Sequence, residues 1–137
     1  MSEKSHKGET FFTSVGCMDG RVQKVVNRYA SLMYGAEYAD TITRAGLDGL
    51  FASAEIDPEV YKSVKDMILV SVDKHKSFGI VVHGHEECAG NPVNDRQHKK
   101  DIKNTVAVIK KMVKGKGVKV RGVYVRLQPR QKIEEVV

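Results

Sequence analysis

Two short segments contain the side chains that could do chemistry in this chain. The segment Gly84-His85-Glu86-Glu87-Cys88 places a histidine and a cysteine three positions apart, directly after an apolar run. The only other cysteine, Cys17, lies far upstream and also follows an apolar run. Thiolate and imidazole are ligands that zinc binds tetrahedrally. We therefore predict that Cys17, His85 and Cys88 bind one zinc ion.

Three protein ligands leave the fourth position of the ion open, which is typical of catalytic rather than structural zinc. Water bound there can have a pKa of about 7, so that it gives a hydroxide nucleophile at neutral pH. Asp19 and Arg21 follow Cys17 closely, and the arginine would keep the Asp19 carboxylate ionised and fix its direction. Asp19 could then accept a hydrogen bond from the hydroxide. Equally, it could itself take the fourth position and close the site.

Simpler interpretations of the same residues stay open. A single cysteine is more often a small buried hydrophobe than a ligand. A closed structural zinc site, with Asp19 as a permanent fourth ligand, is the main alternative to an open one. His83 is either a rival ligand or a packed core residue, while we expect His6, His75 and His98 to be solvated. The combination of Cys-x-Asp-x-Arg with His-x-x-Cys nevertheless favours a metal site.

The elements that must position these residues alternate along the chain. Apolar periodicity predicts strands at 11–15, 39–43, 80–82 and 118–127, with a short antiparallel edge strand at 132–137. It predicts helices at 21–34, 50–54, 58–77 and 97–114. This alternation indicates a single-domain α/β fold with a mostly parallel sheet and helices on both faces. Ligands bind at the carboxyl ends of such strands, so neighbouring first and third strands would bring the two cysteine loops together.

Length and composition restrict the class of protein. The chain has 137 residues, which fits one domain. No segment approaches the ~18 apolar residues of a membrane span, and the polar N-terminus lacks the apolar core of a signal peptide. We therefore expect a cytoplasmic protein that does not bind membranes. In such a compartment two cysteines are more often ligands, catalytic groups or buried residues than a disulfide.

The net charge of +6 is concentrated near the C-terminus, because residues 99–137 contain 12 Lys and Arg but 3 Asp and Glu. A basic segment could bind nucleic acid or an acidic surface. These lysines, however, are interleaved with apolar residues at core spacing, and stacking aromatics do not surround them. We therefore predict a solvated helix face and argue against nucleic acid as a partner.

The motifs resemble those of the β-class carbonic anhydrases. That family has the pattern Cys-x-Asp-x-Arg, then an Arg-Asn-Ala-Gly loop, then Gly-His-x-x-Cys-Gly. The corresponding segments here are Cys17-Met18-Asp19-Gly20-Arg21, Thr43-Arg44-Ala45-Gly46 and Gly84-His85-Glu86-Glu87-Cys88. The resemblance extends from about residue 10 to residue 133, because Gly122-Val123-Tyr124-Val125 is similar to a late Gly-x-x-Tyr strand of the family.

The resemblance implies a sheet with strand order 2-1-3-4 and a metal site of known type. Zinc would be bound by Cys17, His85 and Cys88, with Asp19 and Arg21 as the catalytic dyad. The implied reaction is the reversible hydration of carbon dioxide to bicarbonate by zinc-bound hydroxide, which makes the protein a lyase (a carbonate dehydratase). The resemblance also implies a homodimer or a higher homo-oligomer.

Departures from the family pattern suggest a second hypothesis. Ala89 stands where the family has glycine, and Thr43 and Arg44 replace arginine and asparagine. These changes favour a catalytically silent zinc-binding module of the same fold, with Asp19 as the fourth ligand in a closed state. A hydrolase of another small linear substrate, such as carbon disulfide, is a variant of the first hypothesis.

Overall fold

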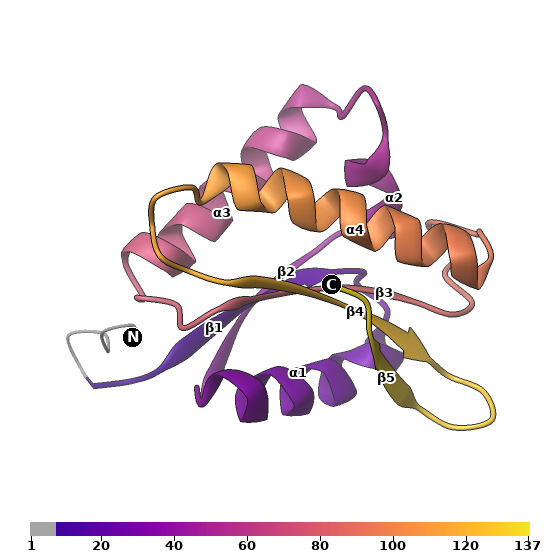
Figure 1. Ribbon diagram of the computed structural model, residues 1–137, viewed down its shortest axis with the longest axis horizontal. Helices are drawn as coiled ribbons and strands as arrows, with labels where there is room; N and C mark the ends of the chain where they lie inside the picture. Colours follow the sequence, from indigo (N-terminus) through magenta and orange to yellow (C-terminus); the bar gives the residue numbers. More distant parts are fainter. Residues whose placement is uncertain (1–7) are drawn as a thin grey trace.

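A five-stranded sheet forms the centre of the computed structural model, which describes residues 8–137 (Figure 1). His6 lies outside these residues. The strands are β1 (Phe11–Gly16), β2 (Tyr38–Thr43), β3 (Ile80–His85), β4 (Val120–Arg126) and β5 (Lys132–Glu135). Their order is β2-β1-β3-β4-β5, with the first four parallel and β5 antiparallel to β4. The predicted strand order and the antiparallel edge strand are therefore confirmed.

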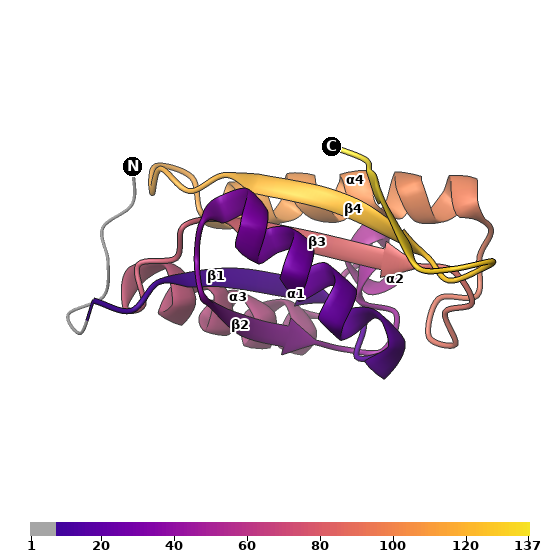
Figure 2. The same cartoon turned by 90° about the horizontal axis from the view of Figure 1, so that it is seen from below.

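Helices cover both faces of the sheet, as the alternation of elements predicted. One face packs against α1 (Gly20–Tyr34), and the other packs against α2 (Leu47–Ala52), α3 (Pro58–Asp73) and α4 (Asp95–Met112), as Figures 1 and 2 show. Successive residues of β3 accordingly enter different cores. Ile80 and Val82 pack with α3 and α4, whereas Val81 packs with α1. A strand segment that is buried on both faces is apolar throughout, which explains the run Ile80-Val81-Val82 at the start of β3.

Capping residues define three of the helix ends. Asp19 caps α1, and its carboxylate accepts a hydrogen bond from the backbone N–H of Arg21. Gly35 ends the same helix in the left-handed conformation, with φ of 64°. Asp57 and Pro58 begin α3.

Three predictions about exposure and boundaries are wrong. The helix predicted over 58–77 ends at Asp73, and Lys76 beyond it adopts a left-handed conformation with φ of 56°. His98 is fully buried rather than solvated, because its Nδ1 atom lies 2.7 Å from the buried carboxylate of Asp48. That partner offsets the cost of burying a polar ring. The short second helix begins at Leu47 rather than Leu50, because Gly46 adopts a left-handed conformation and turns the chain directly into the helix.

No helix among residues 8–137 is long and apolar enough to cross a membrane.

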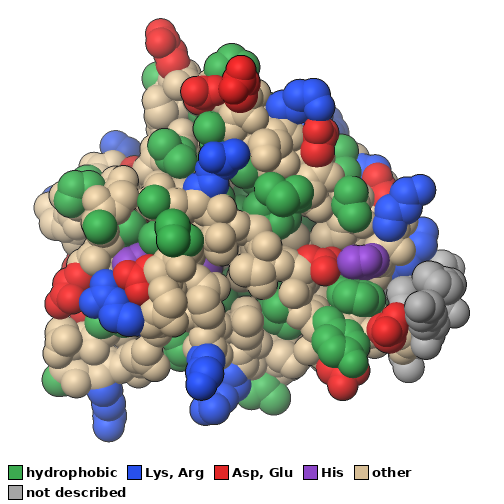
Figure 3. Space-filling view, turned by 180° about the vertical axis from the view of Figure 1, so that it is seen from behind, with side chains coloured by type: hydrophobic (Ala, Val, Ile, Leu, Met, Phe, Trp, Pro, Cys, Tyr) green, Lys and Arg blue, Asp and Glu red, His purple; other side chains and the backbone are tan. Residues whose placement is uncertain are grey.

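On the face seen in Figure 3, Lys and Arg side chains are dispersed among Asp and Glu side chains. On α4 the lysines lie on the side of the helix that faces solvent, whereas residues such as Ile102 and Ile109 are buried against the sheet. The basic residues of this helix thus form a solvated face, as predicted.

The packing of α4 on β4 gives a testable prediction about stability. A Cβ atom on Gly122 would lie 2.6 Å from Cγ2 of Ile102 and 3.0 Å from Cγ2 of Val106, both of which are buried. We expect Gly122→Ala to lower the free energy of unfolding by about 1–3 kcal/mol, measured by urea denaturation. The matched control is Gly20→Ala, whose Cβ would have no atom of the described chain within 4 Å. Equal stabilities of the two variants would contradict this account of the helix–sheet contact.

Candidate metal centre

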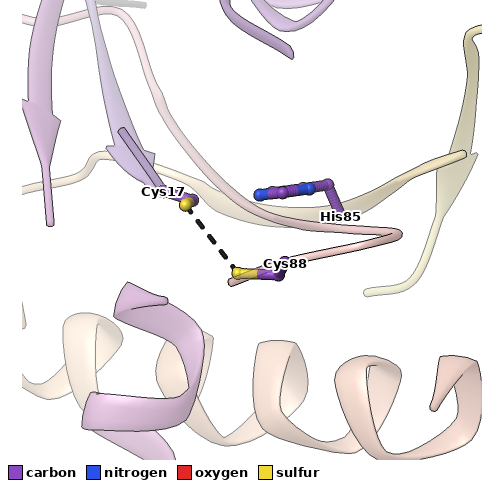
Figure 4. Close-up of side chains that lie close together, drawn as sticks. All are labelled: Cys17, His85 and Cys88. Atoms are coloured by element: carbon purple, nitrogen blue, oxygen red, sulfur yellow. Dashed lines mark hydrogen bonds between the residues drawn. The ribbon is translucent and has the colours of Figure 1, made fainter. Parts of the chain in front are cut away.

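The three predicted ligands lie together at the carboxyl ends of two adjacent strands. Cys17 directly follows β1, His85 is the last residue of β3, and Cys88 lies in the turn after it. Because β1 and β3 pair in parallel, both chain segments reach the same edge of the sheet. The two sulfur atoms are 3.8 Å apart, and the three possible ligand atoms all lie within 4.8 Å of one another (Figure 4).

The chemistry of this cluster fits a metal ion with soft ligands. Both cysteines are buried, and neither forms a disulfide. His85 is buried as well, and its Nδ1 atom bonds the Glu86 carbonyl at 2.7 Å. Its Nε2 atom has no hydrogen-bond partner within residues 8–137. A histidine ligand often donates one ring N–H to a carbonyl while the other nitrogen binds the metal. The orphaned Nε2 beside two thiols therefore fits a zinc site.

A glycine contact brings the middle loop against the cysteines. A Cβ atom on Gly46 would lie 2.3 Å from the carbonyl carbon of Gly90, and one on Gly90 would lie 2.5 Å from that of Ala45. The two loops thus pack backbone against backbone, which only glycine allows at these positions. As a result the N–H of Gly46 points at the Cys17 sulfur, 3.4 Å away. The sequence motif located this loop but did not indicate its contact with Cys17.

The two thiols have different acidities. Burial raises the pKa of Cys17, but the adjacent His85 imidazole and the N–H groups of Gly46 and Asp19 outweigh it and lower this pKa to about 7. Burial and the neighbouring Cys17 raise the pKa of Cys88 to about 11. Burial lowers the pKa of His85, yet its contacts with Cys17 and the Glu86 carbonyl raise it overall. Cys17 is thus the thiol that ionises more readily, and a bound cation would favour ionisation of both.

Asp19 and Arg21 form an ion pair beside the cluster. The Arg21 guanidinium donates to the carboxylate through Nη2 at 2.7 Å and through Nε at 3.1 Å. These hydrogen bonds lower the pKa of Asp19 to about 2. The Asp19 Oδ2 atom lies 3.9 Å from Nε2 of His85. Arg21 also donates to the side chain and the carbonyl of Glu87, which ties the pair to the turn between His85 and Cys88.

His83 does not join the cluster. Its ring lies beneath Gly16, and its Nε2 atom is 3.3 Å from the Cys17 carbonyl oxygen. Burial lowers the pKa of this imidazole to about 4, so it is neutral at physiological pH. It is the packed core residue that the sequence allowed as one of two interpretations.

Comparison with known proteins shows similarity to carbonic anhydrases. The family model described as "Putative carbonic anhydrase" matches residues 7–137. The fold is similar to one of the tetrameric β-carbonic anhydrases of the filamentous ascomycete Sordaria macrospora, with 14% identity over 95% of this chain and 82% of that chain and a TM-score of 0.63. It is also similar to the β-carbonic anhydrase CafA of Aspergillus fumigatus, with 14% identity over 94% and 76% of the two chains and a TM-score of 0.52. No curated protein matches the chain.

The cluster predicts which substitutions remove a bound metal. We expect the purified chain to contain about one zinc ion, and Cys88→Ala and His85→Ala to reduce this content to near zero because each removes one of three ligands. Metal content measured by inductively coupled plasma mass spectrometry tests this. His75→Ala is the control, because that imidazole pairs with Asp40 and lies outside the cluster. Full zinc occupancy in Cys88→Ala would exclude Cys88 from the ligand set.

Proposed function

Since this chain belongs to the β-class carbonic anhydrase family, we propose that it catalyses the reversible hydration of carbon dioxide to bicarbonate with zinc as its cofactor. The observation that supports this most directly is the buried cluster of two thiols and an orphaned imidazole nitrogen, beside an ionised carboxylate. Cys17, His85 and Cys88 would hold the ion. When bound, zinc supplies Lewis acidity, which lowers the pKa of a water molecule to about 7.

The Asp19–Arg21 dyad would orient the reacting water. With its pKa near 2, the Asp19 carboxylate stays ionised at neutral pH and can accept a hydrogen bond from the water. Arg21 fixes the direction of that acceptor, and Glu87 in turn holds Arg21. An oriented water directs its lone pair at the carbon of carbon dioxide, which lowers the entropic part of the barrier. The proton released by the reaction must then leave through solvent or a neighbouring base.

The geometry supports an open site over a closed one. Both carboxylate oxygens of Asp19 accept hydrogen bonds from Arg21, at 2.9 Å from its backbone N–H and 2.7 Å from Nη2. To become the fourth zinc ligand, the carboxylate would have to move closer to the cluster, because it is not among the ligand atoms that lie within 4.8 Å of one another, and such a move would disturb these hydrogen bonds. Because charge-assisted hydrogen bonds of this kind are the strong ones, they favour the catalytic hypothesis over the silent zinc-binding module.

We further infer that the chain forms a homo-oligomer. The Sordaria macrospora enzymes are tetrameric. In this chain Met18, directly beside Cys17, is 63% exposed, and Leu32 on α1 is 80% exposed. Apolar side chains of this size at the surface are suitable for an interface between subunits. Light scattering coupled to size exclusion should give the mass of two or more chains, whereas a monomer at micromolar concentration would contradict the inference.

Substitution of Asp19 tests the proposed reaction. We expect the zinc-loaded chain to hydrate carbon dioxide in a stopped-flow assay, and Asp19→Asn to reduce the rate by about 10²–10⁴-fold. The zinc content should stay unchanged, because Asp19 is not a ligand in the open site. Asp66→Asn is the control, since this carboxylate lies on the exposed face of α3 and pairs with Lys62.

Two outcomes would contradict parts of this proposal. If Asp19→Asn hydrates carbon dioxide as fast as the unaltered chain, the dyad does not orient the water. If the zinc-loaded, unaltered chain does not hydrate carbon dioxide, the catalytic hypothesis fails and the silent zinc-binding module is supported. Carbon disulfide tested in the same assay distinguishes the related hydrolase.

A further inference from the structure

A buried polar network lies between the metal centre and α4. It consists of Asp48 on α2, Asn91 in the loop after Cys88, and His98 and Asp101 on α4, and we call these four residues the Asp48 network. The Asn91 amide donates to Asp48 at 3.1 Å and to Asp101 at 3.0 Å. His98 Nδ1 bonds the other oxygen of Asp48 at 2.7 Å. All four side chains are buried.

The amide of Asn91 is fixed by contacts on two sides. Its single NH₂ group satisfies two carboxylates that come from different helices, so rotation would leave buried acceptors unpaired. A Cβ atom on Gly49 would lie 2.6 Å from the amide carbon of Asn91, which shows how closely the side chain packs on α2. Asn91, three residues after Cys88, is therefore held at a defined place against α2 and α4.

The network also contacts the strand that ends in His85. A Cβ atom on Gly84 would lie 2.5 Å from Oδ2 of Asp48, so this carboxylate lies directly against the backbone that precedes the histidine. Asp48 is two residues beyond Gly46, whose N–H points at the Cys17 sulfur. One buried carboxylate thus contacts the chain segments that contain His85 and Cys88, and it lies two residues from the N–H group that points at Cys17.

The loop that Asn91 anchors also contacts the loop that reaches Cys17. Gly90, which lies between Cys88 and Asn91, packs against the backbone of Ala45 and Gly46, and the N–H of Gly46 points at the Cys17 sulfur. The path of the anchored loop therefore helps to set where Cys88 lies relative to Cys17. Apolar side chains of similar volume would fill the same space without requiring paired buried charges, so packing alone does not account for the network.

We propose that Asp48 and Asn91 are positioning residues of the metal centre. Asp48, paired with His98, holds the Asn91 amide, and Asn91 holds the loop that directly follows Cys88. The inference rests on the proposed zinc site and goes beyond it, because neither residue would touch the ion. Outer contacts of this kind are worth about 10–100-fold in metal affinity.

Zinc affinity tests the role of the network. Competition with a chromophoric chelator should show that Asn91→Ala weakens zinc binding by about 10–100-fold and that Asp48→Asn weakens it in the same direction. With Co²⁺ in place of zinc, both variants should show a changed thiolate-to-metal absorption band. The matched control is Asp40→Asn, because Asp40 also pairs with a histidine, His75, at 2.8 Å, but on β2 and outside the metal cluster. Its zinc affinity should equal that of the unaltered chain.

The outcomes separate a positioning role from a structural one. If Asn91→Ala has a lower melting temperature but unaltered zinc affinity and an unaltered Co²⁺ spectrum, the network only stabilises the fold and the proposal is wrong. Should Asp48→Asn fail to fold, the Asn91→Ala result decides. If the unaltered chain binds no zinc, the proposed function fails together with this inference, whereas zinc binding that is equal in all variants overturns this inference alone.

Discussion

The metal centre depends on the parallel pairing of β1 with β3. Cys17 and the His85–Cys88 turn are far apart in the sequence, and this pairing brings them together. The pairing places Val15 opposite Val82, so the two strands end at the same edge of the sheet. Because β3 is buried on both faces and begins with three apolar residues, the hydrophobic cores on either side fix its position in the sheet. The position of the ligands is therefore a consequence of core packing on two faces.

Asp19 connects the start of a helix to the chemistry of the site. Its carboxylate caps α1, and the same carboxylate is held by the Arg21 guanidinium. Arg21 is the second residue of α1, and Asp19 caps this helix. The geometry of the dyad therefore follows from the geometry of the helix end. An N-cap residue has little conformational freedom, because its backbone enters the helix while its side chain accepts a hydrogen bond from an N–H group of the first turn. The dyad thus needs no additional scaffold beyond α1 and the Glu87 contact.

The elements that sequence could predict are those with a local cause. Asp19, Gly35 and the pair Asp57-Pro58 mark helix ends through their own backbone chemistry, and the apolar pattern located the strands. The three candidate ligands could be proposed because their residue types and their places after strands are visible in the sequence. His98 could not be placed correctly, because its burial depends on Asp48, fifty residues away. A histidine on a lysine-rich helix gives no local signal that a carboxylate lies opposite it.

Other unpredicted contacts involve loops that approach one another closely around the cysteines. Gly46 and Gly90 meet through their backbones, and the same two loops continue into Asp48 and Asn91. The two sulfur atoms, 3.8 Å apart and buried, would repel each other as thiolates in the absence of a cation. A donor that reduces this repulsion is the backbone N–H of Gly46, which points at the Cys17 sulfur. A backbone N–H group does not reveal itself through the type of its side chain. The residues that determine where such donors lie are therefore the ones that anchor the loops.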